Sequence, residues 1–209
     1  MQNLSDTGTM IRSSSHTDPR SRSVLRRRAL LLGGAALGGV AITGAPRLTT
    51  ASLREEDLRA LNLLLLVEQT QAAFYTEAVR RGALKGEVLR YARQVASQED
   101  EHLGFLKRLL GGQARSKPDF DFGDRTRQPD AFAAAAADVE DLAVGAYNGQ
   151  GGNVSREVLA GAATIVSVEA RHAAWIRSIV GQLPAADATD KALSNDEVLE
   201  GLSRLGVRR

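Results

Sequence analysis

The 209-residue sequence contains no cysteine. This absence excludes disulfide bonds, thiolate-ligated zinc, iron–sulfur clusters and a lipid-modified N-terminal cysteine. Aromatic residues are also scarce, at 4% of the chain, although hydrophobic residues make up 43%. Because alanine and leucine are abundant, this composition favours packed helices. The length fits one domain with a tail.

Basic charge is concentrated near the N-terminus. Residues 1–51 hold seven of the 27 basic residues and two of the 25 acidic residues. The rest of the chain therefore carries 20 basic and 23 acidic residues, a net charge of −3. It contains no stripe of basic side chains, so the overall pI of about 9.2 does not indicate nucleic-acid binding. We expect no nucleic acid partner.

The N-terminal segment is typical of an export signal. Arg27-Arg28-Ala29-Leu30-Leu31 resembles the twin-arginine motif and precedes a glycine-rich apolar stretch. That stretch has about 15 residues, fewer than the ~20 that a membrane helix needs. We predict that residues 1–51 are a twin-arginine-type export signal and linker, read by the twin-arginine machinery, with delivery to the periplasm or cell envelope. A basic tail or an uncleaved anchor is the alternative, and cleavage after Ala45 or Ala51 stays open.

Four long helices and a short fifth one are expected after this segment. The first begins with the capping-box pattern Ser52–Glu55, and Gly82 ends it. A second capping box, Ser194–Glu197, opens the short helix. The expected ranges of the four long helices are 52–82, 86–111, roughly 130–148 and roughly 154–180.

The connections between the helices predict the topology. The first and third joints are short, so each joins antiparallel neighbours. The middle connection, "GGQARSKPDFDFGDRTRQP", can span about 60 Å when extended, whereas a helix of ~25 residues is about 38 Å long. The sequence therefore predicts an all-α four-helix bundle over residues 52–182, with one long crossover between the second and third helices. Residues 183–209 form a C-terminal extension with the short helix.

Ionisable side chains interrupt the apolar face of every long helix. The first and third helices carry one glutamate each, and the second and fourth carry Glu-x-x-His. The six residues are Glu68, Glu99, His102, Glu140, Glu169 and His172. Each single glutamate is followed seven residues later by a tyrosine, Tyr75 or Tyr147. A two-helix unit therefore occurs twice, which predicts approximate two-fold symmetry.

Four buried carboxylates need compensating positive charge, because burying an unpaired charge is very costly. Two imidazoles cannot balance four carboxylates, whereas two divalent metal ions can. A glutamate and a histidine three residues apart lie on one helical face, so both can reach the same ion. Carboxylate and imidazole ligands suit iron and manganese. The six residues together therefore predict a two-metal centre.

Five segments carry a family resemblance: "LVEQTQAAFYTEAV", "SQEDEHLGFL", "DVEDLAVGAYNG", "SVEARHAAWI" and the tail "ALSNDEVLEGLSRLG", and "KPDFDFG" in the crossover is also similar. With them the chain resembles the ferritin-like superfamily over residues ~52–206. It resembles in particular the bacterial ferritin-like domain proteins that are related to plant desiccation-related proteins. This resemblance implies two iron ions, or alternatively manganese. It also implies oxidation of Fe(II) by O₂ or peroxide, without the cysteine-ligated iron that supplies electrons in rubrerythrins.

Within such a centre the six residues take different expected roles. Glu99 and Glu169 bridge the ions, and each histidine caps one ion. The remaining two ligands, Glu68 and Glu140, are terminal. Tyr75 and Tyr147 are core aromatics that can also donate hydrogen bonds to ligating carboxylates. Gln98, Asp100 and Glu101 are expected to be solvated.

The functional class and the oligomeric state stay open at the level of sequence. The alternative to an iron oxidoreductase is a non-catalytic stress or desiccation-related envelope protein with a structural or vestigial metal site. Expected partners are the metal ions, O₂ or peroxide and the export machinery, and a homodimer is a further option.

Overall fold

The computed structural model describes residues 53–208, and within them the protein is helical with very little strand. The predicted all-α fold class is therefore confirmed. The helices are α1 (Glu55–Arg81), α2 (Gly86–Leu110), α3 (Pro129–Gln150), α4 (Arg156–Ile179) and α5 (Asn195–Leu205). The short elements are the 3₁₀ turns η2 (Gly111–Gln113) and η3 (Gly123–Thr126) and the strands β1 (Asp119–Phe120) and β2 (Val207–Arg208).

The helix ends agree with the sequence signals at most positions. Gly82 adopts the left-handed conformation (φ 74°) that ends α1, and Ser194 forms the predicted capping box of α5 with Glu197. The predicted start of α1 is wrong, because the helix begins at Glu55 with Arg54 as its N-cap. There Asp57, rather than Glu55, accepts a hydrogen bond from the N-cap backbone. Ser52 lies outside the described residues.

The third joint is displaced along the chain. The predicted end of the third helix, at about residue 148, is early, because α3 continues to Gln150. The joint is therefore 151–155, which ends at the N-cap Ser155 of α4. The two additional residues, 149 and 150, lengthen α3 by about half a turn.

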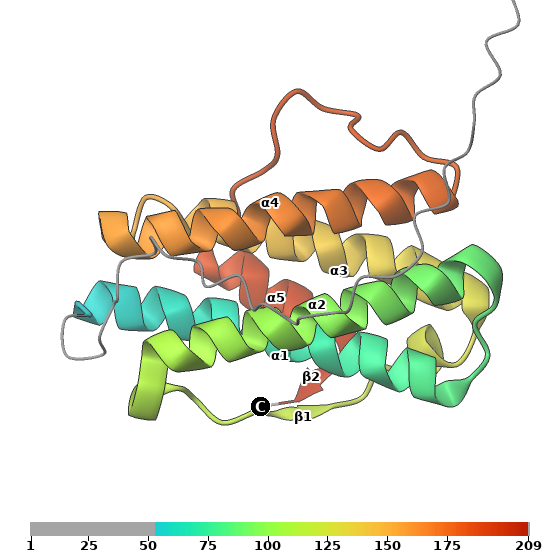
Figure 1. Cartoon of the computed structure of the whole chain (residues 1–209), viewed down its shortest axis with the longest axis horizontal. Coiled ribbons are helices and arrows are strands. Elements are labelled where there is room, and N and C mark those ends of the chain that lie inside the picture. Colours follow the sequence, from blue (N-terminus) through green and yellow to red (C-terminus); the bar gives the residue numbers. More distant parts are fainter. Residues whose placement is uncertain (1–52, 209) are drawn as a thin grey trace, which may run out of the picture. The chain divides into compact units, whose positions relative to one another are not determined.

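The four long helices lie side by side (Figure 1). The helices within the pairs α1–α2 and α3–α4 run antiparallel, whereas α2 and α3 run in the same direction, as the colours in Figure 1 show. The chain between α2 and α3 returns along the length of the bundle. The predicted crossover is thus present, and it lets the two antiparallel pairs face each other around a common core.

Buried amides on α1 anchor this crossover. The Asn62 carbonyl oxygen accepts a hydrogen bond from the Arg115 backbone N–H (2.8 Å), and the Asn62 amide donates to the Gln113 carbonyl (3.1 Å). Two turns further along α1, the Gln69 amide donates to the Arg115 carbonyl (3.3 Å). Strands β1 and β2 pair antiparallel, with Phe120 opposite Val207. These bonds give hydrogen-bond partners to backbone groups of the crossover that would otherwise be left unpaired against the bundle.

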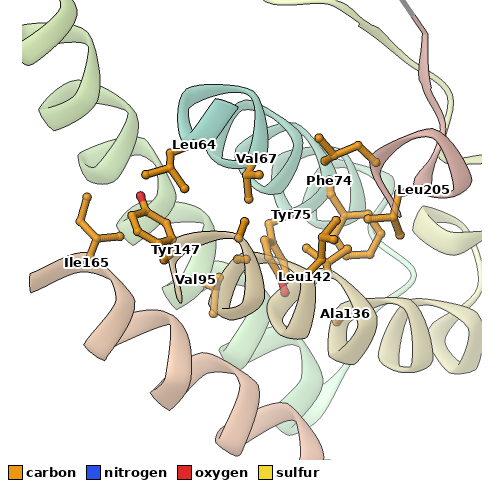
Figure 2. Packing of buried hydrophobic residues seen from close by; sticks show 14 of the residues in the cluster. Leu64, Val67, Phe74, Tyr75, Val95, Ala136, Leu142, Tyr147, Ile165 and Leu205 are labelled. Carbon is orange, nitrogen blue, oxygen red and sulfur yellow. The ribbon is translucent and has the colours of Figure 1, made fainter. Parts of the chain in front are cut away.

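Aromatic side chains fill one part of the core. The Phe74 ring lies 5.2 Å from the Phe132 ring and 5.4 Å from the Phe122 ring, between centroids. All three side chains are at most 2% exposed, and each contributes about 1.5–3 kcal/mol by burial. Figure 2 shows Tyr75 and Tyr147 embedded in the same apolar cluster. The core therefore reaches across the bundle and surrounds both tyrosines.

The C-terminal extension packs against α3. The Leu193 backbone N–H donates to the Gly145 carbonyl (2.9 Å). A Cβ atom at Gly149 would lie 1.8 Å from the Leu193 carbonyl oxygen, so only glycine admits this approach. Among the described residues, no helix has the length and apolar character required to cross a membrane.

Candidate metal centre

All six predicted ligands meet in one buried cluster. The four carboxylates are 0% exposed, whereas His172 is 3% and His102 is 9% exposed. Each side chain lies on the inward face of its helix, at the spacing that turns i and i+3 residues to the same side. The structure thus places the six residues together, while metal ligation by them stays a prediction.

The cluster divides into two overlapping sets of ligand atoms, and within each set all atoms lie within 4.8 Å of one another. One set holds Glu68 and His102 and will be called position 1. The other holds Glu140 and His172 and will be called position 2. Both sets include Glu99 and Glu169. Each set supplies three carboxylate oxygens and one imidazole nitrogen, a donor set that suits iron or manganese.

The two shared carboxylates each turn one oxygen toward each histidine. Glu99 places Oε2 3.4 Å from the His102 Nδ1 and Oε1 3.2 Å from the His172 Nδ1. Glu169 places Oε1 2.9 Å from the His102 Nδ1 and Oε2 3.9 Å from the His172 Nδ1. This is the disposition expected of carboxylates that bridge two cations.

The two terminal carboxylates are each held by a tyrosine from the opposite half of the bundle. Glu68 points Oε2 at the His102 Nδ1 (3.3 Å), and its Oε1 accepts a hydrogen bond from Tyr147 (2.5 Å). Glu140 points Oε2 at the His172 Nδ1 (3.5 Å), and its Oε1 accepts from Tyr75. The two tyrosines therefore orient one terminal carboxylate each.

The cluster also includes three polar residues that the sequence did not predict to belong to it. The Gln71 amide donates to Glu169 Oε2 (2.8 Å) and Glu140 Oε2 (3.3 Å). The Tyr91 and Tyr75 hydroxyls lie 3.0 Å apart. Gln71 follows Glu68 by three residues, so helical periodicity could have placed it on the same face.

The third residue is Gln98, and its expected solvation is wrong. The Gln98 side-chain oxygen lies 2.7 Å from the His172 Nε2, at hydrogen-bond distance. Gln98 belongs to α2 and His172 to α4, so only the packing of these two helices reveals the contact. Asp100 and Glu101, in contrast, are exposed as expected.

The residues present fit a cationic group, because their inward-facing atoms lack partners. Among the described residues, seven buried side-chain nitrogen or oxygen atoms have no hydrogen-bond partner. Six belong to the predicted ligands, and the seventh is the Gln71 Oε1. The six atoms are Glu68 Oε2, Glu99 Oε1 and Oε2, His102 Nδ1, Glu169 Oε1 and His172 Nδ1. Buried polar atoms are normally satisfied, and metal coordination would satisfy these.

The electrostatics of the cluster lead to the same conclusion. Burial raises the pKa of Glu68, and the neighbouring carboxylates raise it further. Burial lowers the pKa of both histidines, but the facing carboxylates outweigh it and raise the pKa of His102 and of His172 to about 12. Without a cation, the cluster therefore keeps protons that a bound metal ion would displace.

A comparison with known families agrees with the fold and the cluster. The sequence profile of the ferritin-like domain matches residues 56–182, which span α1 to α4 and all six residues of the cluster. A search of curated proteins finds no match. The matched segment covers more than half of the chain, and the helical bundle has the architecture expected of the family. The chain therefore belongs to the ferritin-like domain family.

Proposed function

We propose that the protein binds two iron ions in this cluster and catalyses the oxidation of Fe(II) by O₂ or peroxide. The observation that carries the proposal is the pair of overlapping ligand sets, in which five of the six residues have buried atoms without a hydrogen-bond partner. Glu68 and His102 would hold one ion at position 1, and Glu140 and His172 would hold the other at position 2. Glu99 and Glu169 would be shared.

Charge balance supports a pair of divalent ions. Four carboxylates balance the four positive charges of two Fe(II) ions, which removes the cost of burying the carboxylates unpaired. Bound Fe(II) would supply the electrons for reduction of O₂ or peroxide. The protein's own contribution is to hold these ligands in a nearly water-free core, with Tyr75 and Tyr147 orienting the terminal carboxylates.

The test is anaerobic loading of the metal-free protein with Fe(II), followed by exposure to air. We expect two iron ions per chain, an oxo-bridged ferric absorption band and consumption of Fe(II) faster than in buffer. The double variant Glu99→Ala with His102→Ala should lose all three, whereas Glu101→Ala, at an exposed position of the same helix, should keep them. Fe(II) consumption no faster than in buffer by the parent protein contradicts the proposal.

Manganese is the alternative metal, because the same carboxylate and imidazole donors suit it. Elemental analysis of protein purified from its native compartment distinguishes iron from manganese. A manganese form would release O₂ from peroxide, which an oxygen electrode detects. If the protein contains manganese but releases no O₂ from peroxide, both the iron oxidase and the manganese catalase activities are rejected.

A second candidate function is a non-catalytic envelope protein with a structural metal. The burial of the cluster favours it, since no ligand is more than 9% exposed. In that case removal of the metal would lower the melting temperature, and the parent protein would show no turnover with Fe(II) or peroxide. Turnover by the parent protein rejects this candidate.

We also propose that the protein is exported through the twin-arginine route. The support is the motif Arg27-Arg28-Ala29-Leu30-Leu31, which lies outside the described residues. Twin-arginine export passes folded proteins, so the metal could be loaded before transport. Cell fractionation should find the protein in the periplasm or envelope, and Arg27→Lys with Arg28→Lys should retain it in the cytoplasm. An unchanged distribution of the double variant contradicts this route.

A further inference from the structure

The two metal positions have the same ligand types but different supporting contacts. The His172 ring at position 2 meets a hydrogen-bond acceptor on its outer nitrogen, because the Gln98 oxygen lies 2.7 Å from the His172 Nε2. Gln98 directly precedes the shared Glu99 in α2. At the corresponding place in α4, directly before Glu169, the chain has Val168, which offers no side-chain acceptor.

This difference affects which nitrogen of the ring is free for a metal ion. When a metal ion displaces the Nδ1 proton, an acceptor at Nε2 keeps the remaining proton on Nε2, so the Nδ1 lone pair is directed into the cluster. It also fixes the orientation of the ring and increases the basicity of the ligating nitrogen. His172 is also the more buried of the two rings, at 3% exposed against 9% for His102.

The terminal carboxylates differ in the same direction. Both oxygens of Glu140 have protein donors, because Tyr75 donates to Oε1 and Gln71 donates to Oε2. Glu68 has one donor, Tyr147, and its Oε2 is among the buried atoms without a partner. Glu140 is therefore held in its ligating orientation more completely than Glu68.

We propose that these contacts make position 2 the first to bind a metal ion, and that Gln98 is the positioning residue with the clearest effect. The inference rests on the two-metal function proposed above. Pre-oriented ligands lose less conformational freedom on binding, so position 2 binds its ion more tightly. Position 1 then fills at higher metal concentration.

The test is titration of the metal-free, full-length protein with Mn(II). Calorimetry measures the two dissociation constants, and electron paramagnetic resonance monitors the bound ions. At one equivalent we expect the signal of an isolated Mn(II) ion, and at two equivalents the signal of a coupled pair. The two dissociation constants should differ by about tenfold or more. A coupled signal that grows from the first addition, or two equal constants, would overturn the proposal.

Variants that copy one half of the chain into the other provide matched controls. Gln98→Val, which reproduces Val168, should weaken the tighter step about tenfold and leave the weaker step unchanged. Gln98→Glu keeps an acceptor and should restore the tight step, which a purely packing role of Gln98 does not predict. Val168→Gln should tighten the weaker step. If Gln98→Val binds like the parent, Gln98 does not set the order.

Failure of the inference differs from failure of the proposed function. If Mn(II) and Fe(II) bind nowhere in the cluster, both proposals fall. If two ions bind with the expected signals but with equal constants, only the inference about order falls. Glu140→Gln identifies the first position, because it should abolish the tight step, whereas Glu68→Gln should abolish the weak one.

Discussion

The first helix pair, α1–α2, and the second pair, α3–α4, build the same cluster from the same sequence unit. Each pair contributes a glutamate, a tyrosine seven residues later and a Glu-x-x-His motif. The contacts are reciprocal, since the tyrosine of one pair donates to the terminal glutamate of the other. The ligands are therefore symmetric between the pairs.

The supporting residues are not symmetric. Gln71, Gln98 and Tyr91 belong to the first pair, and the corresponding residues of the second pair are Ala143, Val168 and Gly161. Gln71 and Gln98 contact ligands of the second pair directly, at Glu140, Glu169 and His172. Tyr91 contacts the Tyr75 hydroxyl, which in turn donates to Glu140. The comparison teaches that a repeated ligand pattern can create two metal positions of unequal quality.

The largest effect is expected from the shared carboxylates. Glu99→Ala and Glu169→Ala each remove an oxygen from both positions, so either change should weaken binding of both ions about 100-fold or more. Calorimetry with Mn(II) measures the loss, and circular dichroism checks the helical content. If either variant still binds one ion with parental affinity, the changed carboxylate is not shared by the two positions.

The terminal carboxylates should separate the two positions. Glu68→Ala is expected to remove only the ion at position 1, and Glu140→Ala only the ion at position 2, with about 100-fold loss of the affected ion. Elemental analysis after dialysis should then find one metal ion per chain. Asp100→Ala, at an exposed site on α2, should retain two. Loss of both ions from Glu68→Ala would show that the positions are not separable.

The two pairs also differ at the start of their first helices. Asp57 near the start of α1 accepts a hydrogen bond from the Ser155 backbone N–H (2.6 Å) at the start of α4, whereas the corresponding residue of α3 is Pro129. Burial acts to raise the pKa of Asp57, but hydrogen bonds from Arg54 and Ser155 outweigh it and lower the pKa from 3.8 to about 2.

This depressed pKa predicts pH-dependent stability. A carboxyl whose folded pKa lies below its unfolded value contributes fully above the unfolded pKa, and the contribution is lost as the pH falls toward 2. Chemical denaturation should show a loss of about 2 kcal/mol between pH 5 and pH 2 that Asp57→Asn removes. The matched change Asp130→Asn, exposed in the first turn of α3, should leave the pH profile unchanged. Parental pH dependence in Asp57→Asn contradicts this assignment.

The smallest effect is expected from the tyrosines, and it should cross between the pairs. Tyr75→Phe removes the donor to Glu140 and should weaken the ion at position 2, while Tyr147→Phe should weaken the ion at position 1. Each loss is expected to be about tenfold, because each tyrosine acts on a ligand rather than on the ion. Calorimetry of the two variants compares them directly, and a loss confined to the tyrosine's own pair would contradict the crossed hydrogen bonds.

Most of the fold could be predicted because its signals are local. The apolar periodicity, the glycine at residue 82 and the Ser194 capping box act within one or two turns of the chain, so they are readable without tertiary information. The start of α1 differs from the prediction because Arg54 is the N-cap and the Asp57 side chain accepts from its backbone N–H. The side chain of Asp57 also bonds to Ser155 from another helix, which no local pattern encodes.

The candidate site also contains residues that the sequence predicts and residues that it does not. The six proposed ligands were visible because charged residues on an apolar helical face are rare without a partner. Gln98 was missed because glutamine on a half-exposed helical face is ordinary, and its partner His172 is 74 residues away. Gln71 and Tyr91 were missed because polar residues beside a core carry no distinctive charge signal.

The amino-acid sequence alone determined that four helices carry four carboxylates and two imidazoles inward, since helical periodicity decides which face each residue occupies. It also determined that a long crossover separates two similar pairs. Only the tertiary structure decided which oxygen faces which histidine, which carboxylates are shared and which pair receives the additional hydrogen bonds. Those features depend on distances between side chains of different helices, and such distances arise only when the four helices pack together.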